Sequence, residues 1–78
     1  MRYSERPQPA LGAAIRQLRR KRGVTQERLA EDACLTAATL SLIERGRANP
    51  TWDTVKKIAA ALDSSLGELG TLADKLEA

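Results

Sequence analysis

The sequence predicts an all-α protein of five short helices, and two observations support this prediction. Apolar residues recur at helical spacing, which is clearest at positions i, i+3, i+4 and i+7 formed by Leu11, Ala14, Ile15 and Leu18. Residues suited to begin or end a helix separate the apolar runs, namely Thr25, Thr36, Thr51, Gly23 and Gly46. Only 3% of the residues are aromatic, so the core must be built from aliphatic side chains.

The first helix is expected to begin at Ala10, after a polar, proline-containing stretch of residues 1–9 that we expect to be a flexible arm. One face is apolar, and the opposite face carries Arg16, Gln17, Arg19 and Arg20. Lys21 and Arg22 place positive charge in the last turn, where the helix dipole favours it. Gly23 suits the end of the helix, because glycine tolerates a left-handed backbone.

The second and third helices are expected to be short and close together. The second begins after Thr25, residues 34–35 form a brief connection, and the third covers residues 37–45. The small side chain of Ala30 falls where two such helices must approach each other. Residues 25–44 are therefore predicted to form a helix-turn-helix, a motif whose second helix fits the major groove of DNA.

A fourth helix is expected after Thr51, with an apolar stripe of Val55, Ile58, Ala59 and Leu62. Trp52, at its start, is expected to cover the edge of the core, with a place in an interface as the alternative. Ser65 and Glu68 have the spacing of a capping box that opens a fifth helix. Its leucines exceed what one domain edge needs, so we expect a dimer contact formed by Leu66, Leu69, Leu72 and Leu76. The alternative is that this helix folds back on the first and fourth helices.

Length and charge limit the organisation and the partners. The chain of 78 residues fits one domain, for which we expect a DNA-binding body over residues 10–70 and a C-terminal helix over residues 66–78. Residues 1–57 carry 12 Lys and Arg against 6 Asp and Glu, whereas residues 58–78 carry 1 against 4. This asymmetry favours a polyanionic partner for the N-terminal part, although a mixed solvated surface has the same composition.

Cysteine and histidine, which supply most metal ligands and many catalytic groups, are scarce in this sequence. With 1 Cys and no His, the chain has no basis for an intramolecular disulfide, a zinc site or nucleophilic catalysis, so neither an enzyme nor a cofactor is expected. No apolar run approaches the roughly 20 residues of a membrane-spanning helix. The N-terminus lacks the apolar core of a signal peptide, and a cytoplasmic protein without membrane partners is expected.

Five pieces of sequence, taken in order, carry a resemblance to a known family: Thr25-Gln26-Glu27, Leu29-Ala30, the run Leu40 to Gly46, Asn49-Pro50, and the run Ile58 to Leu62. With them, residues 11–69 resemble the Cro and λ-repressor-like family, also called the Xre family. The resemblance implies a compact five-helix bundle and a transcriptional regulator that binds double-stranded DNA as a homodimer. We expect a repressor that binds an inverted-repeat operator with half-sites about one helical turn apart.

The resemblance also implies roles for individual residues. It places Gln26 against a phosphate at the start of the second helix, and it places Arg45, Arg47 and Asn49 along the DNA backbone. Arg19 and Glu44 match a pair that bridges the first helix to the end of the third, which we interpret as structural. Cys34 stands where the family often has glycine, so it must tolerate the backbone of the turn.

The positions expected to face DNA bases depart from the family pattern. The principal positions fall on Ala37, Ala38 and Leu42, none of which forms the paired hydrogen bonds that distinguish bases. The remaining polar candidates are Thr36, Thr39 and Ser41. Three explanations are open: contact with thymine methyl groups, readout of DNA shape, or a surface that binds protein. The third corresponds to an alternative function, a protein-interaction module such as an antitoxin or an accessory subunit.

Overall fold

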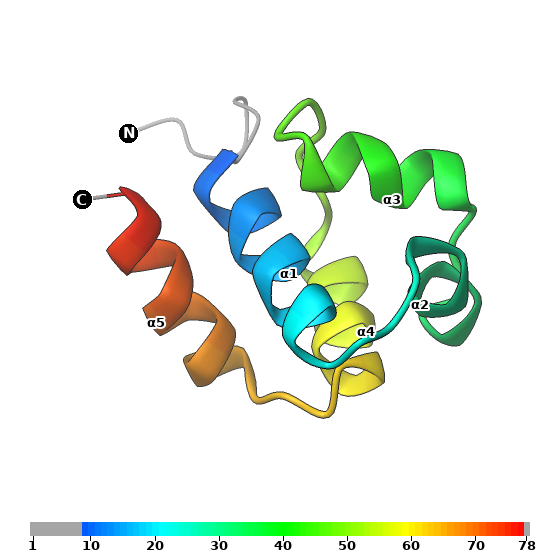
Figure 1. The fold of residues 1–78 in the computed structure, drawn as a ribbon. Helices are drawn as coiled ribbons and strands as arrows, with labels where there is room; N and C mark the ends of the chain where they lie inside the picture. Colours follow the sequence, from blue (N-terminus) through cyan, green and yellow to red (C-terminus); the bar gives the residue numbers. More distant parts are fainter. Residues whose placement is uncertain (1–8, 78) are drawn as a thin grey trace.

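The computed structural model describes residues 9–77, and these form five α-helices (Figure 1). The helices are α1 (Pro9–Lys21), α2 (Gln26–Asp32), α3 (Ala37–Glu44), α4 (Trp52–Ala61) and α5 (Leu66–Glu77). The predicted all-α, five-helix fold is confirmed. The expected flexible arm lies outside the described residues, except for Pro9, which is the first residue of α1. Within residues 9–77, no helix has the length and apolarity needed to cross a membrane.

Three of the predicted N-caps have both the hydrogen bond and the backbone conformation of a capping residue. The side-chain oxygens of Thr25, Thr36 and Thr51 each accept a hydrogen bond, 3.1 Å long, from the backbone N–H three residues later. Each of the three threonines has an extended backbone, as N-caps require. At the start of α5, Ser65 Oγ accepts from the backbone N–H of Glu68 at 2.9 Å, and the Glu68 carboxylate accepts from the Ser64 hydroxyl at 3.0 Å.

The first four helices end in the same way. In each, the residue after the C-cap has a left-handed backbone, with φ of 70° at Gly23, 59° at Cys34, 72° at Gly46 and 55° at Asp63. Each of these ends carries the paired hydrogen bonds of a Schellman motif, for example Cys34 N to Glu31 O and Leu35 N to Ala30 O. Cys34 therefore does occupy a backbone position that favours glycine, as the family resemblance implied.

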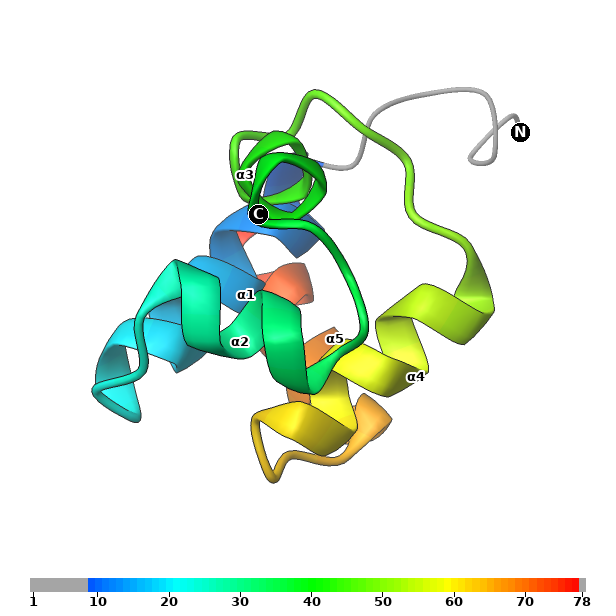
Figure 2. The same ribbon diagram turned by 90° about the vertical axis from the view of Figure 1, so that its right-hand side faces the viewer.

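Helix α1 occupies the middle of the fold, with α5 on one side and α3 on the other (Figure 1). Figure 2 shows α4 below and to the right of α3, and α4 contacts α2 and α5. The core where these helices meet is entirely aliphatic, and its largest fully buried side chains are Ile15, Leu29, Leu40, Ile58, Leu62 and Leu69. The apolar stripe predicted for the fourth helix, Val55, Ile58, Ala59 and Leu62, lies in this core.

Gly12 allows α1 and the end of α3 to approach closely. A Cβ built at Gly12 would overlap the carbonyl oxygen of Ile43 and would lie 3.1 Å from the carbonyl oxygen of Glu44. Both neighbours are backbone atoms, which cannot rotate away as a side chain can. The contact between α1 and α3 therefore depends on a residue without a side chain.

Two sequence predictions about exposed apolar surface are wrong. Leu69 is 1% exposed and belongs to the core of the protomer itself, so it cannot be a dimer contact. Leu66 and Leu72 are half-buried against that core, whereas Leu76 is 42% exposed. Helix α5 folds back on α1 and α4, as the alternative expected, and its buried Leu69 joins the common core. Trp52 is 66% exposed and does not cover the core edge.

Candidate nucleic-acid interface

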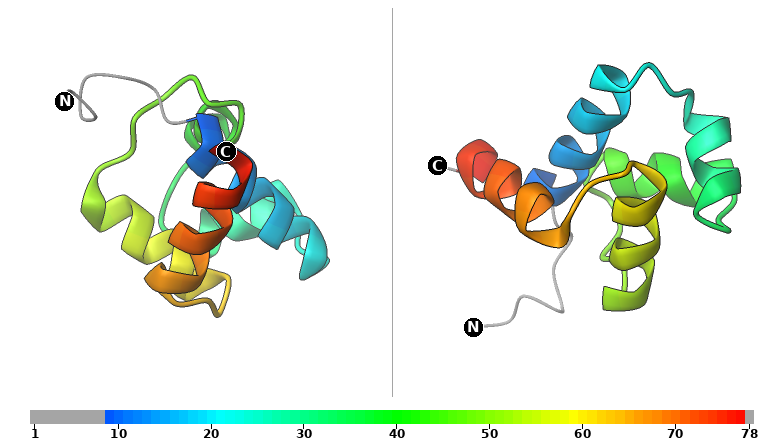
Figure 3. Two further views of the ribbon diagram at one scale, coloured as in Figure 1. Left: turned by 90° about the vertical axis from the view of Figure 1, so that its left-hand side faces the viewer. Right: turned by 90° about the horizontal axis from the view of Figure 1, so that it is seen from below.

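Helices α2 and α3 form the predicted helix-turn-helix, joined by residues 33–36. Seen from below, this pair lies at the end of the molecule opposite α5 (Figure 3, right). The small Ala30 and the side chain of Leu29 are buried, as are Leu40 and Ile43 on α3. Burial of these four residues fixes α2 against α3 and leaves the opposite face of α3 exposed.

The exposed face of α3 is apolar at its centre and basic at its C-terminal end. Ala38 and Leu42 are one turn apart on this face, both are exposed, and Arg45 follows on the same side. Ala37 and Ser41 are half-buried at its edge. Of the residues that the sequence analysis expected to face bases, the structure therefore exposes Thr36, Ala38, Thr39 and Leu42, and the two at the centre of this face, Ala38 and Leu42, lack hydrogen-bonding groups.

Capping reduces the number of hydroxyl groups that remain for other contacts. Thr36 Oγ1 accepts from the backbone N–H of Thr39 and donates to Thr39 Oγ1 at 2.9 Å. Its donor is therefore engaged within the helix. The Thr39 hydroxyl still has its own hydrogen to donate, because it acts as the acceptor in this contact. Of the polar residues predicted to face bases, Thr39 is thus exposed with a hydroxyl hydrogen still to donate, whereas Thr36 is part of the cap.

Arg19 and Glu44 form the expected pair in a partly buried network. Arg19 Nε lies 2.7 Å from Glu44 Oε2 and Arg19 Nη2 lies 3.0 Å from Glu44 Oε1, which is a bidentate contact. Arg19 Nη1 also donates to the carbonyl of Val24 at 3.0 Å. The side chain of Glu44 is 2% exposed and that of Arg19 is 13% exposed, so water screens the pair weakly.

The hydrogen bond from Arg19 to Glu44 raises the pKa of the guanidinium above its ordinary value, and burial offsets only part of this effect. The stabilisation that this cation contributes is therefore fully present below the ordinary arginine pKa. It is lost only as the pH rises through the raised value, so Arg19 remains charged across the neutral range.

Gln26, the first residue of α2, joins the same network. Its Nε2 donates to Glu44 Oε1 at 3.1 Å. One amide hydrogen is therefore engaged, while the second hydrogen and the carbonyl oxygen of the side chain remain for a ligand. Glu44 thereby links the start of α2 and the end of α3 to α1, which fixes the orientation of the helix-turn-helix on the body.

The predicted backbone-contacting residues surround the end of α3. Arg45 is exposed, and its Nε donates to the carbonyl of Ser41 at 3.3 Å. Arg47 and Asn49 are exposed in the loop that leads to α4. Gly46, between the two arginines, has its backbone against Pro9 at the start of α1. Two exposed arginines therefore lie at and just after the C-terminal end of α3, on a backbone held against α1.

Sequence reasoning missed two residues that shape this region. Arg22 was expected only to favour the helix dipole, but its Nε donates to the carbonyl of Leu62 at 2.8 Å and its Nη2 to that of Asp63 at 3.3 Å. It thereby joins the end of α1 to the end of α4. Gly12 was not singled out at all. The sequence holds only a faint signal for it, a glycine on the apolar side of a helix otherwise rich in alanine.

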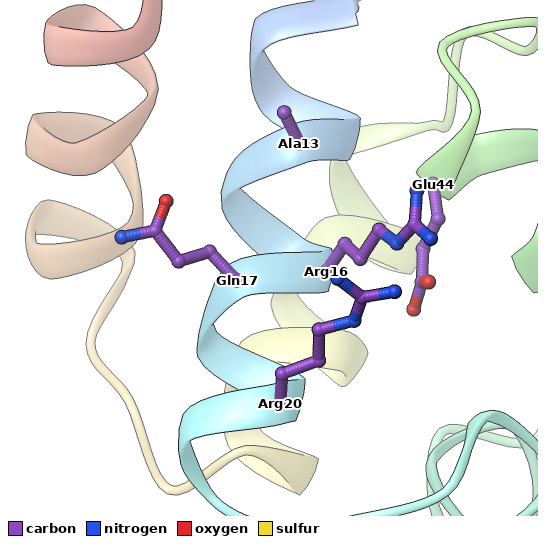
Figure 4. A pocket seen from close by; sticks show the side chains of 5 residues that line it. All are labelled: Ala13, Arg16, Gln17, Arg20 and Glu44. Carbon is purple, nitrogen blue, oxygen red and sulfur yellow. The ribbon is translucent and has the colours of Figure 1, made fainter.

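A groove of about 300 Å³ lies beside α1, next to the end of α3, and is lined by Ala13, Arg16, Gln17, Arg20 and Glu44. Figure 4 shows the side chains of Arg16 and Arg20 extending from α1 toward Glu44, whereas Gln17 points toward α5. Within the described part of the chain, no group of His, Cys, Asp and Glu side chains has the arrangement of a metal site.

Comparison with known proteins agrees with this geometry. The sequence profile of a helix-turn-helix family matches residues 15–69. The chain belongs to this helix-turn-helix family. It is 40% identical over 65 residues to an uncharacterized HTH-type transcriptional regulator, y4dJ, of Sinorhizobium fredii, and the match covers 83% of this chain and 84% of the relative. It is 42% identical over 52 residues to the immunity repressor protein of Bacillus phage phi105, covering 67% of this chain and 36% of the repressor.

Solved structures of other helix-turn-helix proteins have the same fold. The clp gene regulator ClgR of Corynebacterium glutamicum superimposes with a TM-score of 0.89 at 34% identity, covering 91% of both chains. The restriction-modification controller protein C.Esp1396I, solved as a tetramer with its natural 35 base-pair operator, superimposes with a TM-score of 0.81 at 28% identity, covering 87% of this chain and 90% of that one. The family resemblance inferred from the sequence is confirmed, as is the predicted class of function, DNA-binding transcriptional regulation.

Proposed function

We propose that this helix-turn-helix protein is a transcriptional repressor that binds an inverted-repeat operator as a homodimer. The observation that carries the proposal is the exposed face of α3 with Arg45 and Arg47 at its end, on a helix-turn-helix held rigidly by Glu44. The operator complex of C.Esp1396I and the name of the phage immunity repressor support it. The proposal includes the cytoplasmic location expected from the sequence, and it assigns the chain no catalytic role.

In this proposal Gln26, Arg45, Arg47 and Asn49 contact the DNA backbone. Arginine forms paired hydrogen bonds with phosphate oxygens, and the two exposed arginines lie at the C-terminal end of the helix that would enter the major groove. Such contacts hold the protein on DNA of any sequence, and their strength falls steeply as salt rises.

Selection of bound fragments from a random DNA pool tests the proposal directly. A palindromic motif is expected, and binding to it should weaken by orders of magnitude between about 50 and 200 mM salt if six to ten phosphates are contacted. The variant Arg45→Ala/Arg47→Ala should weaken binding to all sequences about equally and reduce the salt dependence. Failure to enrich any DNA would refute the proposed function.

We propose that base recognition uses thymine methyl groups, contacted by Leu42 and Ala38. Both side chains are exposed and apolar at the centre of the α3 face, and apolar side chains are suited to the methyl group that thymine presents in the major groove. Replacing the relevant thymines by uracil removes only that methyl group, and burial of one CH₂-sized group contributes about 0.8 kcal/mol. Affinity should therefore fall about fourfold for each methyl lost.

When uracil replaces only the thymine that Leu42 contacts, the variant Leu42→Ala should bind the thymine and uracil versions of the operator with equal affinity, which separates methyl contact from readout of shape. Wild-type protein that binds both versions equally would favour shape readout, because the missing methyl groups would then carry no binding energy.

For the dimer, we propose a contact that includes Leu76, with Leu66 and Leu72 at its edge. Leu76 is 42% exposed in the protomer, so its replacement leaves the core intact. Leu76→Lys should therefore give folded monomers in sedimentation, and a Leu76→Lys protein that remains dimeric would place the contact elsewhere.

The exposed apolar Leu42 also favours a second function, a protein-interaction module of the same fold. A protein partner bound through Leu42 would show little dependence on salt and would be lost in Leu42→Ala, whereas Arg45→Ala/Arg47→Ala would leave it unchanged.

A further inference from the structure

The groove beside α1 is lined by two arginines and one acid, Glu44. Arg16 and Arg20 are exposed, and neither forms an ion pair with another residue in the range 9–77. The acid in the lining, Glu44, already accepts hydrogen bonds from Arg19 and Gln26. Two unpaired guanidinium groups therefore point into one groove (Figure 4).

The spacing of the two arginines is unfavourable for the helix itself. Like charges four residues apart on one helix destabilise it by about 0.2–0.5 kcal/mol, because the side chains share a face. An anion in the groove removes this repulsion. A groove of about 300 Å³ is ample for one phosphodiester group. Its two non-bridging oxygens accept hydrogen bonds, and two arginines on one side of the groove can donate to them.

The groove lies next to the residues that are proposed to contact the DNA backbone. Glu44 is the last residue of the recognition helix α3, and it contacts Gln26, the first residue of α2. The groove therefore continues the row of predicted backbone contacts away from α3 and onto α1. DNA held by Gln26 would carry its next phosphates along this side of the molecule.

We infer that the groove formed by Arg16 and Arg20 binds a phosphodiester of the DNA backbone that flanks the half-site read by α3. This inference rests on the proposed function. Its ligand is a phosphate of double-stranded DNA, and an acidic protein surface is the competing ligand that the test must separate.

The test compares Arg16→Gln/Arg20→Gln with a control, Lys57→Gln/Lys75→Gln, which removes the same charge from α4 and α5. Binding to the selected operator is measured by fluorescence anisotropy over a range of salt concentrations. If each protomer loses one phosphate contact, a dimer loses two, and the slope of log K against log salt should fall by about 1.8. Near 0.15 M salt this corresponds to a loss of about thirtyfold in affinity. The control should keep the wild-type slope.

Ethylation interference locates the contact. Wild-type protein should be blocked by ethylation of a phosphate outside the half-site, and the arginine variant should be indifferent to it. An unchanged slope and pattern in a folded variant would overturn the inference and leave the proposed function standing. A variant that binds DNA normally but loses an acidic protein partner would also overturn it. Wild-type protein without salt-dependent DNA binding would instead refute the proposed function.

Discussion

Replacing Gly12 by alanine tests the packing that positions the recognition helix. The new Cβ would overlap the carbonyl oxygen of Ile43 and press on that of Glu44 at 3.1 Å. Because both are backbone atoms of the last turn of α3, α1 and α3 must move apart to admit the methyl group. Overpacking of this kind costs about 1–3 kcal/mol, and contact with backbone places Gly12→Ala at or above the upper end of that range.

A gain in helix propensity opposes this cost. Alanine inside a helix is more favourable than glycine by about 1 kcal/mol. The net loss is therefore about 2 kcal/mol, and for a domain of this size each kcal/mol shifts Tm by about 4–8 °C. Gly12→Ala should consequently melt roughly 8–16 °C below the wild type.

Thermal unfolding followed by circular dichroism measures this shift, and Gly70→Ala is the matched control. A Cβ at Gly70 meets nothing within 4 Å, so the same substitution in α5 should raise Tm by about 4–8 °C. The two variants are thus expected to move in opposite directions. If Gly12→Ala melts at or above the wild-type temperature, the close approach of α1 and α3 described here is wrong.

Three further predictions concern stability. Cys34→Gly should stabilise the protein by about 0.5–1 kcal/mol in urea unfolding, because glycine relieves the left-handed backbone at φ 59°, whereas Cys34→Ala should give no gain. Arg19→Met should cost about 3–5 kcal/mol because it leaves the Glu44 carboxylate buried, and the double variant with Glu44→Met should recover most of this loss; a single variant within 1 kcal/mol of wild type would refute the network. Thr36→Ala should cost about 1 kcal/mol through loss of the cap, and a change in unfolding free energy near zero would show that the cap contributes nothing.

The sequence predicted the features that depend on local chemistry. Thr25, Thr36 and Thr51 cap helices through hydrogen bonds that span three residues, so the signal and its partner lie together in the chain. Gly23 and Gly46 end helices for an equally local reason, the backbone conformation of one residue. Pairing of Arg19 with Glu44 is not local, and only the family resemblance brought these two residues together.

Contacts that depend on how two helices pack against each other could not be predicted from the sequence. Gly12 matters because the end of α3 passes over it, and Arg22 matters because two carbonyl groups of the end of α4 lie within its reach. Leucine spacing along α5 showed that one face is apolar, but could not say whether the protomer or a second copy covers it. The fold resolves this for Leu69, which the protomer buries, and leaves Leu76 exposed.

Because the exposed face of α3 is apolar at its centre, base recognition depends strongly on how rigidly α3 is held. Hydrogen bonds select a base by direction, whereas a contact between Leu42 and a methyl group selects it only by fit, which is lost when the helix shifts. Under the proposed function, discrimination between bases therefore depends on residues that never touch them, above all Gly12 and the Arg19–Glu44–Gln26 network that fixes the end of α3. Folded variants of these residues should lose preference for the operator over random DNA more than they lose affinity for random DNA, since the arginine contacts with phosphate tolerate small shifts. Equal losses on both kinds of DNA would show that the network supports the fold without orienting the recognition helix.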